Sequence, residues 1–122
     1  MDAGRYISAR KALDKASEAY VSVSFDSVEV SYLPEEIAIG RVKKTLCYKA
    51  IPEKAGDLTE VAILELDPGA EILIHQHTVD MEYYINTADN TAKVCHSGEW
   101  HGYANTTRKP MTIISVKLAV IV

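Results

Sequence analysis

The sequence predicts an antiparallel β-barrel or β-sandwich of about eight short strands, preceded by one short helix. Three observations support this fold. In most segments after residue 20, apolar residues alternate with polar ones, as expected for strands with one buried face. Turn signals such as Asp67-Pro68-Gly69 separate these segments. One segment, residues 8–20, instead has the spacing of a helix.

The composition is that of a soluble globular protein, with 48% hydrophobic and 25% charged residues in a chain of 122. This length predicts a single domain over residues 1–122. A net charge of −4 gives no general attraction to nucleic acid or to anionic lipid. No apolar run has the length of a signal peptide or a membrane span, so we expect a cytoplasmic protein with neither nucleic-acid nor membrane partners. Cys47 and Cys95 are expected to be reduced, partly buried thiols.

The predicted helix has Ser8 as a candidate N-cap, and Leu13, Ala16 and Tyr20 fall on one apolar face. The charges of its acidic and basic side chains largely cancel. We therefore expect an amphipathic helix packed on the outside of a sheet and not a basic recognition helix.

Residues 21–32 alternate in two phases, and the phase changes at Asp26-Ser27. A two-residue hairpin and a β-bulge explain this change equally well. Residues 37–48 and 58–66 are predicted as two further strands, joined by a loop over residues 52–57. The Lys43-Lys44 pair is expected on the solvated surface.

The next predicted strand covers residues 71–79, and both of its faces are largely apolar. One face must look into the barrel, and the other must be covered by the N-terminal segment, by a second sheet or by another subunit. The predicted faces are Leu73, His75, His77 and Val79 on one side and Ile72, Ile74, Gln76 and Thr78 on the other.

Four residues are the predicted metal ligands. His75 and His77 are two positions apart, so in a strand both imidazoles point the same way. A turn at residues 80–81 allows Glu82 to start an antiparallel neighbour of the histidine strand, and His101 supplies a fourth ligand. Burying three imidazoles and a carboxylate without a metal is costly. The set predicts one divalent transition metal: iron, manganese, nickel, copper or zinc.

These stretches resemble the cupin superfamily, small jelly-roll-like barrels built as a double-stranded β-helix with two short motifs. The first motif is matched at Gly69, His75, His77 and Glu82, with Asp89 at the position of its closing glycine. The second is matched at Gly98, His101 and Asn105, with Asn90 where glycine is usual and His96 where proline is usual.

The resemblance covers about residues 58–116. Asn90 is a mild departure, because asparagine tolerates the positive φ that glycine supplies. Positions 89 and 90 close one motif and open the next, so the hairpin that separates the motifs in this family is expected to be missing or much reduced.

The resemblance implies several activities: dioxygenase, isomerase, decarboxylase or lyase, and also non-catalytic ligand sensing. A His3Glu set around a six-coordinate divalent ion leaves a formal charge of about +1 and two open positions, which favours small polar or anionic molecules. Two hypotheses follow: a metalloenzyme acting on such a metabolite, or a non-catalytic metal-dependent binding module. The fold does not choose between them.

Catalytic residues are candidates by position only. In strands, Glu82 shares a face with Tyr84, and His101 shares a face with Tyr103, so both tyrosines are predicted to line the metal cavity. His96 replaces a proline at a turn and is expected at the surface or behind a ligand.

The C-terminal strand, residues 111–122, ends in five apolar residues. Such an end is expected to be buried, either under the N-terminal segment or in a symmetric dimer. The resemblance to cupins, which are often dimers, favours a homodimer.

Overall fold

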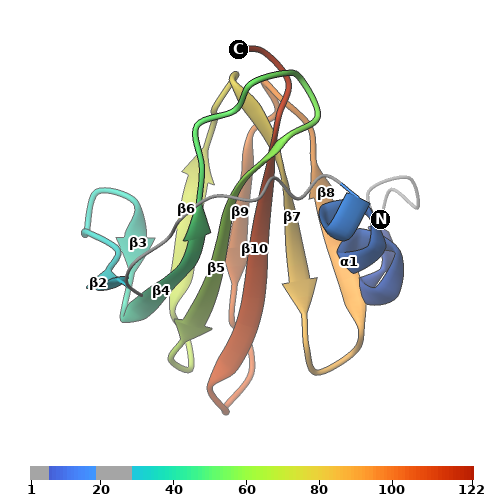
Figure 1. Cartoon of the computed structure of the whole chain (residues 1–122). Coiled ribbons are helices and arrows are strands. Elements are labelled where there is room, and N and C mark those ends of the chain that lie inside the picture. Colours follow the sequence, from blue (N-terminus) through green and yellow to red (C-terminus); the bar gives the residue numbers. More distant parts are fainter. Residues whose placement is uncertain (1–5, 19–28) are drawn as a thin grey trace.

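The computed structural model describes residues 6–18 and 29–122, which form one helix and ten strands (Figure 1). In chain order the elements are β1 Tyr6–Ser8, α1 Ala9–Glu18, β2 Glu29–Tyr32, β3 Ala38–Ile39, β4 Val42–Lys49, β5 Leu58–Leu66, β6 Glu71–His75, β7 Asp80–Asn86, β8 Thr91–Cys95, β9 His101–Ala104 and β10 Met111–Ala119. Within these residues, no helix has the length and apolar character needed to cross a bilayer.

The strands form two antiparallel sheets. The larger has the order β1-β8-β7-β10-β5-β4-β2, and the smaller has the order β3-β6-β9. A buried cluster with residues from both sheets, such as Leu66, Ile72 and Ile113, fills part of the space between them. The predicted all-β antiparallel barrel with a short helix is confirmed.

Helix α1 covers the outer face of the large sheet, as predicted, and lies against β7 and β8 (Figure 1). Ser8 caps it, since its Oγ accepts a hydrogen bond from the Lys11 amide at 3.1 Å. The predicted apolar face is wrong at Leu13, which is 44% exposed, and Tyr20 lies outside the described residues. The buried face is instead made of small side chains, which let the helix approach the sheet closely: Ala9, Ala12 and Ala16.

The predicted strand over residues 37–48 is in fact two strands in different sheets, β3 and β4. The break is at Gly40, which has a φ of 71°. This conformation favours glycine, and a Cβ at this position would lie 3.2 Å from Ala70. The large apolar residues change phase at this break, from Ile37 and Ile39 to Val42 and Leu46, but the pattern alone does not show that the chain passes to the other sheet.

Strand β6 is shorter than predicted and ends at His75. A register shift between Ile72 and His75, where β6 pairs with β9, changes which residues face inward. Ile72 is therefore buried in the barrel, although the alternation placed it opposite to His75. Ile74, at 68% exposed, does face outward, and in the described part of the chain nothing buries it.

Three further expectations concern Asn90, the phase change at residues 26–27 and the C-terminal strand. Asn90 closes the short β7–β8 connection with a φ of 58°, as its replacement of glycine predicted. The phase change at Asp26-Ser27 lies outside the described residues. Strand β10 lies inside the large sheet between β7 and β5, and Leu118 is buried in the cluster that α1 covers. Val122 is 75% exposed, so the homodimer remains a prediction.

Candidate metal centre

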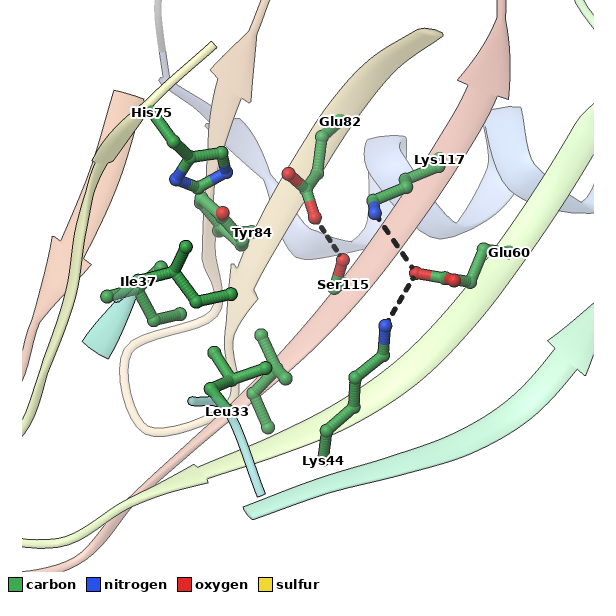
Figure 2. Close-up of a pocket in the computed structure, with 11 residues that line it drawn as sticks. Leu33, Ile37, Lys44, Glu60, His75, Glu82, Tyr84, Ser115 and Lys117 are labelled. Atoms are coloured by element: carbon green, nitrogen blue, oxygen red, sulfur yellow. Dashed lines mark hydrogen bonds and ion pairs between the residues drawn. The ribbon is translucent and has the colours of Figure 1, made fainter. Parts of the chain in front are cut away.

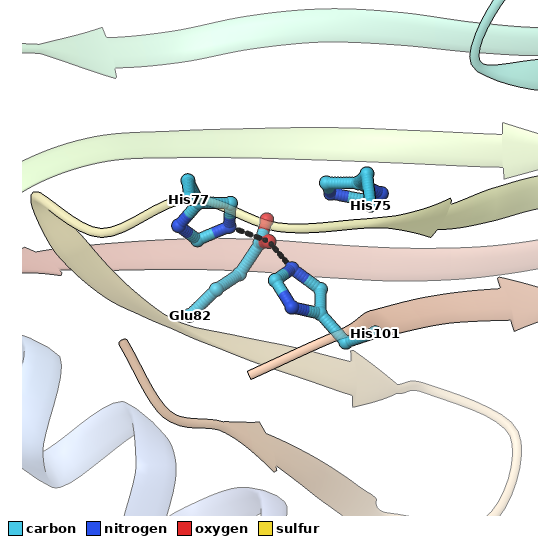
Figure 3. A group of neighbouring side chains, drawn as sticks. All are labelled: His75, His77, Glu82 and His101. Carbon is cyan, nitrogen blue, oxygen red and sulfur yellow. Dashed lines mark hydrogen bonds and ion pairs between the residues drawn. The ribbon is translucent and has the colours of Figure 1, made fainter. Parts of the chain in front are cut away.

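Four side chains converge inside the barrel, and we call them the His3Glu group: His75, His77, Glu82 and His101 (Figure 3). One ligand atom from each lies within 4.8 Å of all the others. The structure brings the four predicted residues together, although the predicted arrangement of their strands is partly wrong. Glu82 does not start a neighbour of the histidine strand, because β7 pairs with β8 and β10 in the large sheet. Its carboxylate instead approaches the histidines from the opposite sheet.

The three histidines come from one side of the barrel. His75 ends β6 and His101 begins β9, and the two are direct partners in the small sheet. Their ring centroids are 4.4 Å apart. His77 lies two residues beyond the end of β6, with its ring centroid 4.6 Å from that of His101. The bulge in β6 thus brings His75 to the interior, and the loop that follows brings His77 beside it.

Backbone carbonyls fix the orientation of two imidazoles. His75 Nδ1 lies 2.8 Å from the Leu73 carbonyl oxygen, and His101 Nδ1 lies 2.8 Å from the Glu99 carbonyl oxygen. A carbonyl only accepts, so Nδ1 carries the hydrogen in both rings and the neutral ring keeps a lone pair on Nε2. In His77 the Nδ1 atom lies 2.5 Å from Asp80 Oδ1.

Glu82 is the centre of the group. It is 3% exposed, and its Oε1 lies 3.3 Å from both His77 Nε2 and His101 Nε2. Its other oxygen, Oε2, accepts a hydrogen bond from Ser115 Oγ. Burial acts to raise the pKa of Glu82, but the interactions with His101, His77, Lys117 and Ser115 outweigh it and hold this pKa well below the ordinary value. The carboxylate is therefore anionic.

The donor set fits a divalent ion. When the His101 ring is neutral, with its hydrogen on Nδ1, the Nε2 atom has a lone pair and faces Glu82 Oε1 at 3.3 Å. Two lone pairs in this position require a cation between them, either a proton or a metal ion. Burial lowers the pKa of His75, which favours its neutral, metal-binding form, whereas the hydrogen bond with Glu82 raises the pKa of His77. Imidazole and carboxylate ligands suit first-row transition metals.

A cavity of about 110 Å³ adjoins the group (Figure 2). His75, Glu82 and Tyr84 border one end of it. This volume is below the roughly 300–1,000 Å³ of pockets for drug-sized ligands, so the cavity suits a small molecule. Its apolar wall is Leu33, Ile37, Leu64 and Ile72, and its other polar residues are Lys44, Glu60, Ser115 and Lys117.

Sequence reasoning missed the lysine pair in this cavity. Lys44, expected on the surface, points inward, and its Nζ lies 3.3 Å from Glu60 Oε2. Lys117 Nζ lies 3.2 Å from the same oxygen. A signal was present: Lys44 is in phase with Val42 and Leu46, which are both buried.

The three candidate catalytic residues have different positions. Tyr84 is 2% exposed and lines the cavity; burial, followed by the charge of Glu82, raises its pKa, so it keeps its proton. Tyr103 packs against Tyr84 at 5.6 Å, and its hydroxyl accepts a hydrogen bond from Asn86 at 3.3 Å, but it borders a hollow outside the metal cavity. His96 is exposed in the turn after β8 and is not among the residues that line the cavity.

No family model matches this sequence. Over 71 residues, 53% of the chain, it is 34% identical to Ribonuclease R of Aquifex aeolicus, and the match spans 10% of that relative's length.

Solved structures give a broader match. A predicted oxalate decarboxylase of Thermotoga maritima superposes with a TM-score of 0.60 at 16% identity, covering 82% of this chain and 100% of the other. An acetylacetone dioxygenase of Acinetobacter johnsonii superposes with a TM-score of 0.51 at 17% identity, covering 80% of this chain and 76% of the other. A cupin 2 conserved barrel domain protein of Rhodopseudomonas palustris superposes with a TM-score of 0.50 at 17% identity, covering 78% of this chain and 72% of the other. At these identities the likeness concerns the fold.

Proposed function

We propose that this chain, which has the fold of the cupin superfamily, binds one divalent transition metal at the His3Glu group and acts there as a metalloenzyme on a small polar or anionic metabolite. The observation that carries the proposal is the convergence of one ligand atom each from three histidines and Glu82, all within 4.8 Å of one another, around a buried carboxylate. When bound, the metal supplies Lewis-acid chemistry to oxygen atoms of a ligand.

The chain's own residues supply orientation and charge. Leu73 and Glu99 carbonyls hold two imidazoles, and Ser115 holds the carboxylate of Glu82. Tyr84 offers a protonated hydroxyl to the cavity. These contacts support a site that is preorganised before a ligand enters it.

Charge supports an anionic ligand. Two lysines and two glutamates line the cavity, so their formal charges cancel: +2 from Lys44 and Lys117, and −2 from Glu60 and Glu82. Adding a divalent ion with neutral imidazoles leaves +2 beside the cavity. A small molecule with anionic oxygen atoms balances this charge.

A second candidate function is non-catalytic, metal-dependent binding of the same class of molecule. Three titratable groups at the cavity are held in one protonation state: the pKa of Glu82 is lowered, and the pKa values of Tyr84 and Lys117 are raised. None of these three is tuned for proton transfer near neutral pH. This observation favours a binding module.

Metal content tests the proposal. We expect the natively purified protein to carry about one equivalent of transition metal, and chelation to lower its Tm, because free metal at 100 times Kd adds about 2.7 kcal/mol of stability. His101→Ala should lose the metal. His96→Ala is the matched control, since His96 is an exposed histidine of the preceding turn. Equal metal content in wild type and His101→Ala would exclude the assigned site.

Turnover separates the two candidate functions. The metal-loaded protein is incubated with short oxygen-bearing acids, and proton NMR follows each one over a day, with a His101→Ala sample alongside. Conversion by wild type alone indicates an enzyme. Line broadening of a ligand that is never converted, lost in His101→Ala, indicates the binding module.

A further inference from the structure

A row of charged residues crosses the large sheet on its inner face. In the pairing of β10 with its two neighbours, Lys117 lies directly opposite Glu60 of β5 on one side and Glu82 of β7 on the other. Ser115 hydrogen-bonds to Glu82, and the Lys117 ammonium pairs with Glu60 (Figure 2). Lys117 therefore lies between the His3Glu group and Glu60.

Lys44 adds a second ammonium group to this end of the cavity. It reaches from β4 to the same oxygen of Glu60 that Lys117 contacts (Figure 2). Side-chain exposure is 25% for both lysines and 15% for Glu60, so solvent screens the charges of this cluster only in part. Two ammonium groups share the carboxylate of Glu60, so these three residues together carry a formal charge of +1 before Glu82 is counted.

Both lysines keep hydrogen-bonding capacity toward the cavity. An ammonium group has three N–H donors, and the contact with Glu60 uses one donor of each lysine. Burial acts to lower the pKa of Lys117, but the charges of Glu82 and Glu60 outweigh this effect and raise it, so the group is cationic. Leu33 and Leu64 give the cavity an apolar lining beside the lysines, with Leu64 directly opposite Lys44 in the pairing of β4 with β5.

We propose that Lys44 and Lys117, bridged by Glu60, form a subsite that binds a carboxylate of the substrate while another oxygen of the same molecule lies at the His3Glu group. This inference rests on the proposed function and narrows its substrate class. Two ammonium groups match the two oxygens of a carboxylate. The substrate is then a short-chain carboxylic acid with a second oxygen donor.

The cavity limits the length of this acid. The volume of about 110 Å³ is well below the roughly 300–1,000 Å³ of pockets for drug-sized ligands, so only a short carbon chain fits. The apolar wall covers the carbon chain.

Calorimetry of zinc-loaded protein tests the subsite, with malonate and succinate as probes. Propionate, which lacks the second carboxylate, and inorganic phosphate are the comparison ligands. We expect malonate or succinate to bind at least about tenfold more tightly than either, since a hydrogen bond to a charged group contributes about 1.5–3 kcal/mol. Lys44→Met should weaken that binding about 10- to 100-fold. Lys44→Gln replaces it if the methionine variant does not fold.

Lys43→Met is the matched control. Lys43 precedes Lys44 in β4, faces the other side of the sheet and pairs with Glu65 at 3.7 Å. Its removal should leave dicarboxylate affinity within about twofold, as expected of an exposed ion pair.

Glu60→Gln gives a result of opposite sign. It removes the shared anion from the lysines, so dicarboxylate affinity should rise. If the cluster were only a structural ion-pair network, Lys44→Met and Glu60→Gln would both lower the Tm and leave affinity unchanged. That result, or equal affinity for propionate and succinate, overturns the subsite.

Failure of the subsite is distinguishable from failure of the proposed function. Zinc stoichiometry is measured first in wild type and in each variant. A protein that takes up no zinc contradicts the proposed function, and dicarboxylate binding to the metal-free protein, with and without Lys44→Met, then decides the subsite. Stoichiometric zinc with no dicarboxylate binding overturns the subsite alone.

Discussion

Two buried polar clusters in this barrel differ in how their hydrogen-bonding capacity is used. Asn105, which is 1% exposed, donates from its Nδ2 to the carbonyls of Leu66, Asp67 and Lys109, at 3.0, 3.2 and 2.8 Å. Its Oδ1 accepts from the Thr107 amide and hydroxyl, at 3.0 and 2.7 Å. Protein groups therefore satisfy every polar atom of this amide.

The His3Glu group has the opposite property. Backbone carbonyls contact the outer nitrogens of His75 and His101, and Ser115 donates to Glu82 Oε2. The inner atoms, Nε2 of His77 and of His101, instead each lie 3.3 Å from Glu82 Oε1. A saturated cluster holds chain segments together, and a cluster in which imidazole nitrogens converge on a carboxylate is suited to a cation. Both contain residues of the same family motifs, so the motif alone does not separate the two roles.

The largest effect is expected for Glu82→Gln. Glutamine keeps the shape of the glutamate side chain but removes the negative charge at the centre of the His3Glu group. Metal affinity should fall by more than about 100-fold, the upper end of the loss seen when groups behind a ligand are removed. Competition with a fluorescent chelator measures this change. An unchanged affinity would mean that the metal binds elsewhere.

Asn105→Ala should act on stability and not on metal. It leaves three carbonyls without their donor, which costs about 2–3 kcal/mol in the free energy of unfolding. Urea denaturation measures the loss. The folded fraction should still bind one equivalent of metal, and a variant that folds normally yet loses its metal would break the comparison between the two clusters.

Gly102→Ala should affect both properties to a smaller degree. A Cβ at this position would lie 2.5 Å from the Ile72 carbonyl oxygen, beside the bulge that brings His75 to the interior. We expect a loss of about 1–3 kcal/mol of stability, the usual cost of overpacking, together with weaker metal binding. Gly98→Ala does not serve as a control because its positive φ adds strain of another kind.

The smallest effect is expected for Ser115→Ala, which removes the donor to Glu82 Oε2 and leaves all four ligands in place. Metal affinity should fall about tenfold, the lower end of the loss for such supporting residues. Thr112→Ala is a matched hydroxyl deletion on the exposed part of the same strand and should leave the affinity unchanged. A loss as large as that of Glu82→Gln would show that the carboxylate cannot hold its position without Ser115.

The sequence predicted which residues come together better than the strands that present them. Residue type and spacing identify His75, His77, Glu82 and His101, and Leu58–Leu66 has the predicted bounds. The division of β3 from β4 at Gly40 and the phase change in β6 were missed. Both depend on pairing with distant strands, and local alternation carries no information about that pairing.

The lysine subsite was missed for a different reason. A lysine in a strand is usually solvated, and the strand pattern around Lys44 is only partly apolar. Its inward position becomes clear once β4, β5 and β10 are neighbours, because Glu60 then lies between two ammonium groups. The sequence alone does not show this contact, because the three residues come from three separate strands.

The position of β10 has a consequence for how the barrel opens. Hydrogen bonds to β5 and β7 hold it on both sides, whereas β9 pairs with β6 alone, through a ladder that the bulge interrupts. Amide hydrogen exchange should therefore be slowest around Val116 and much faster at His101. We therefore expect the wall that carries Glu82 to stay closed while the opposite wall opens locally, so that exchange of a bound ion takes place on the histidine side.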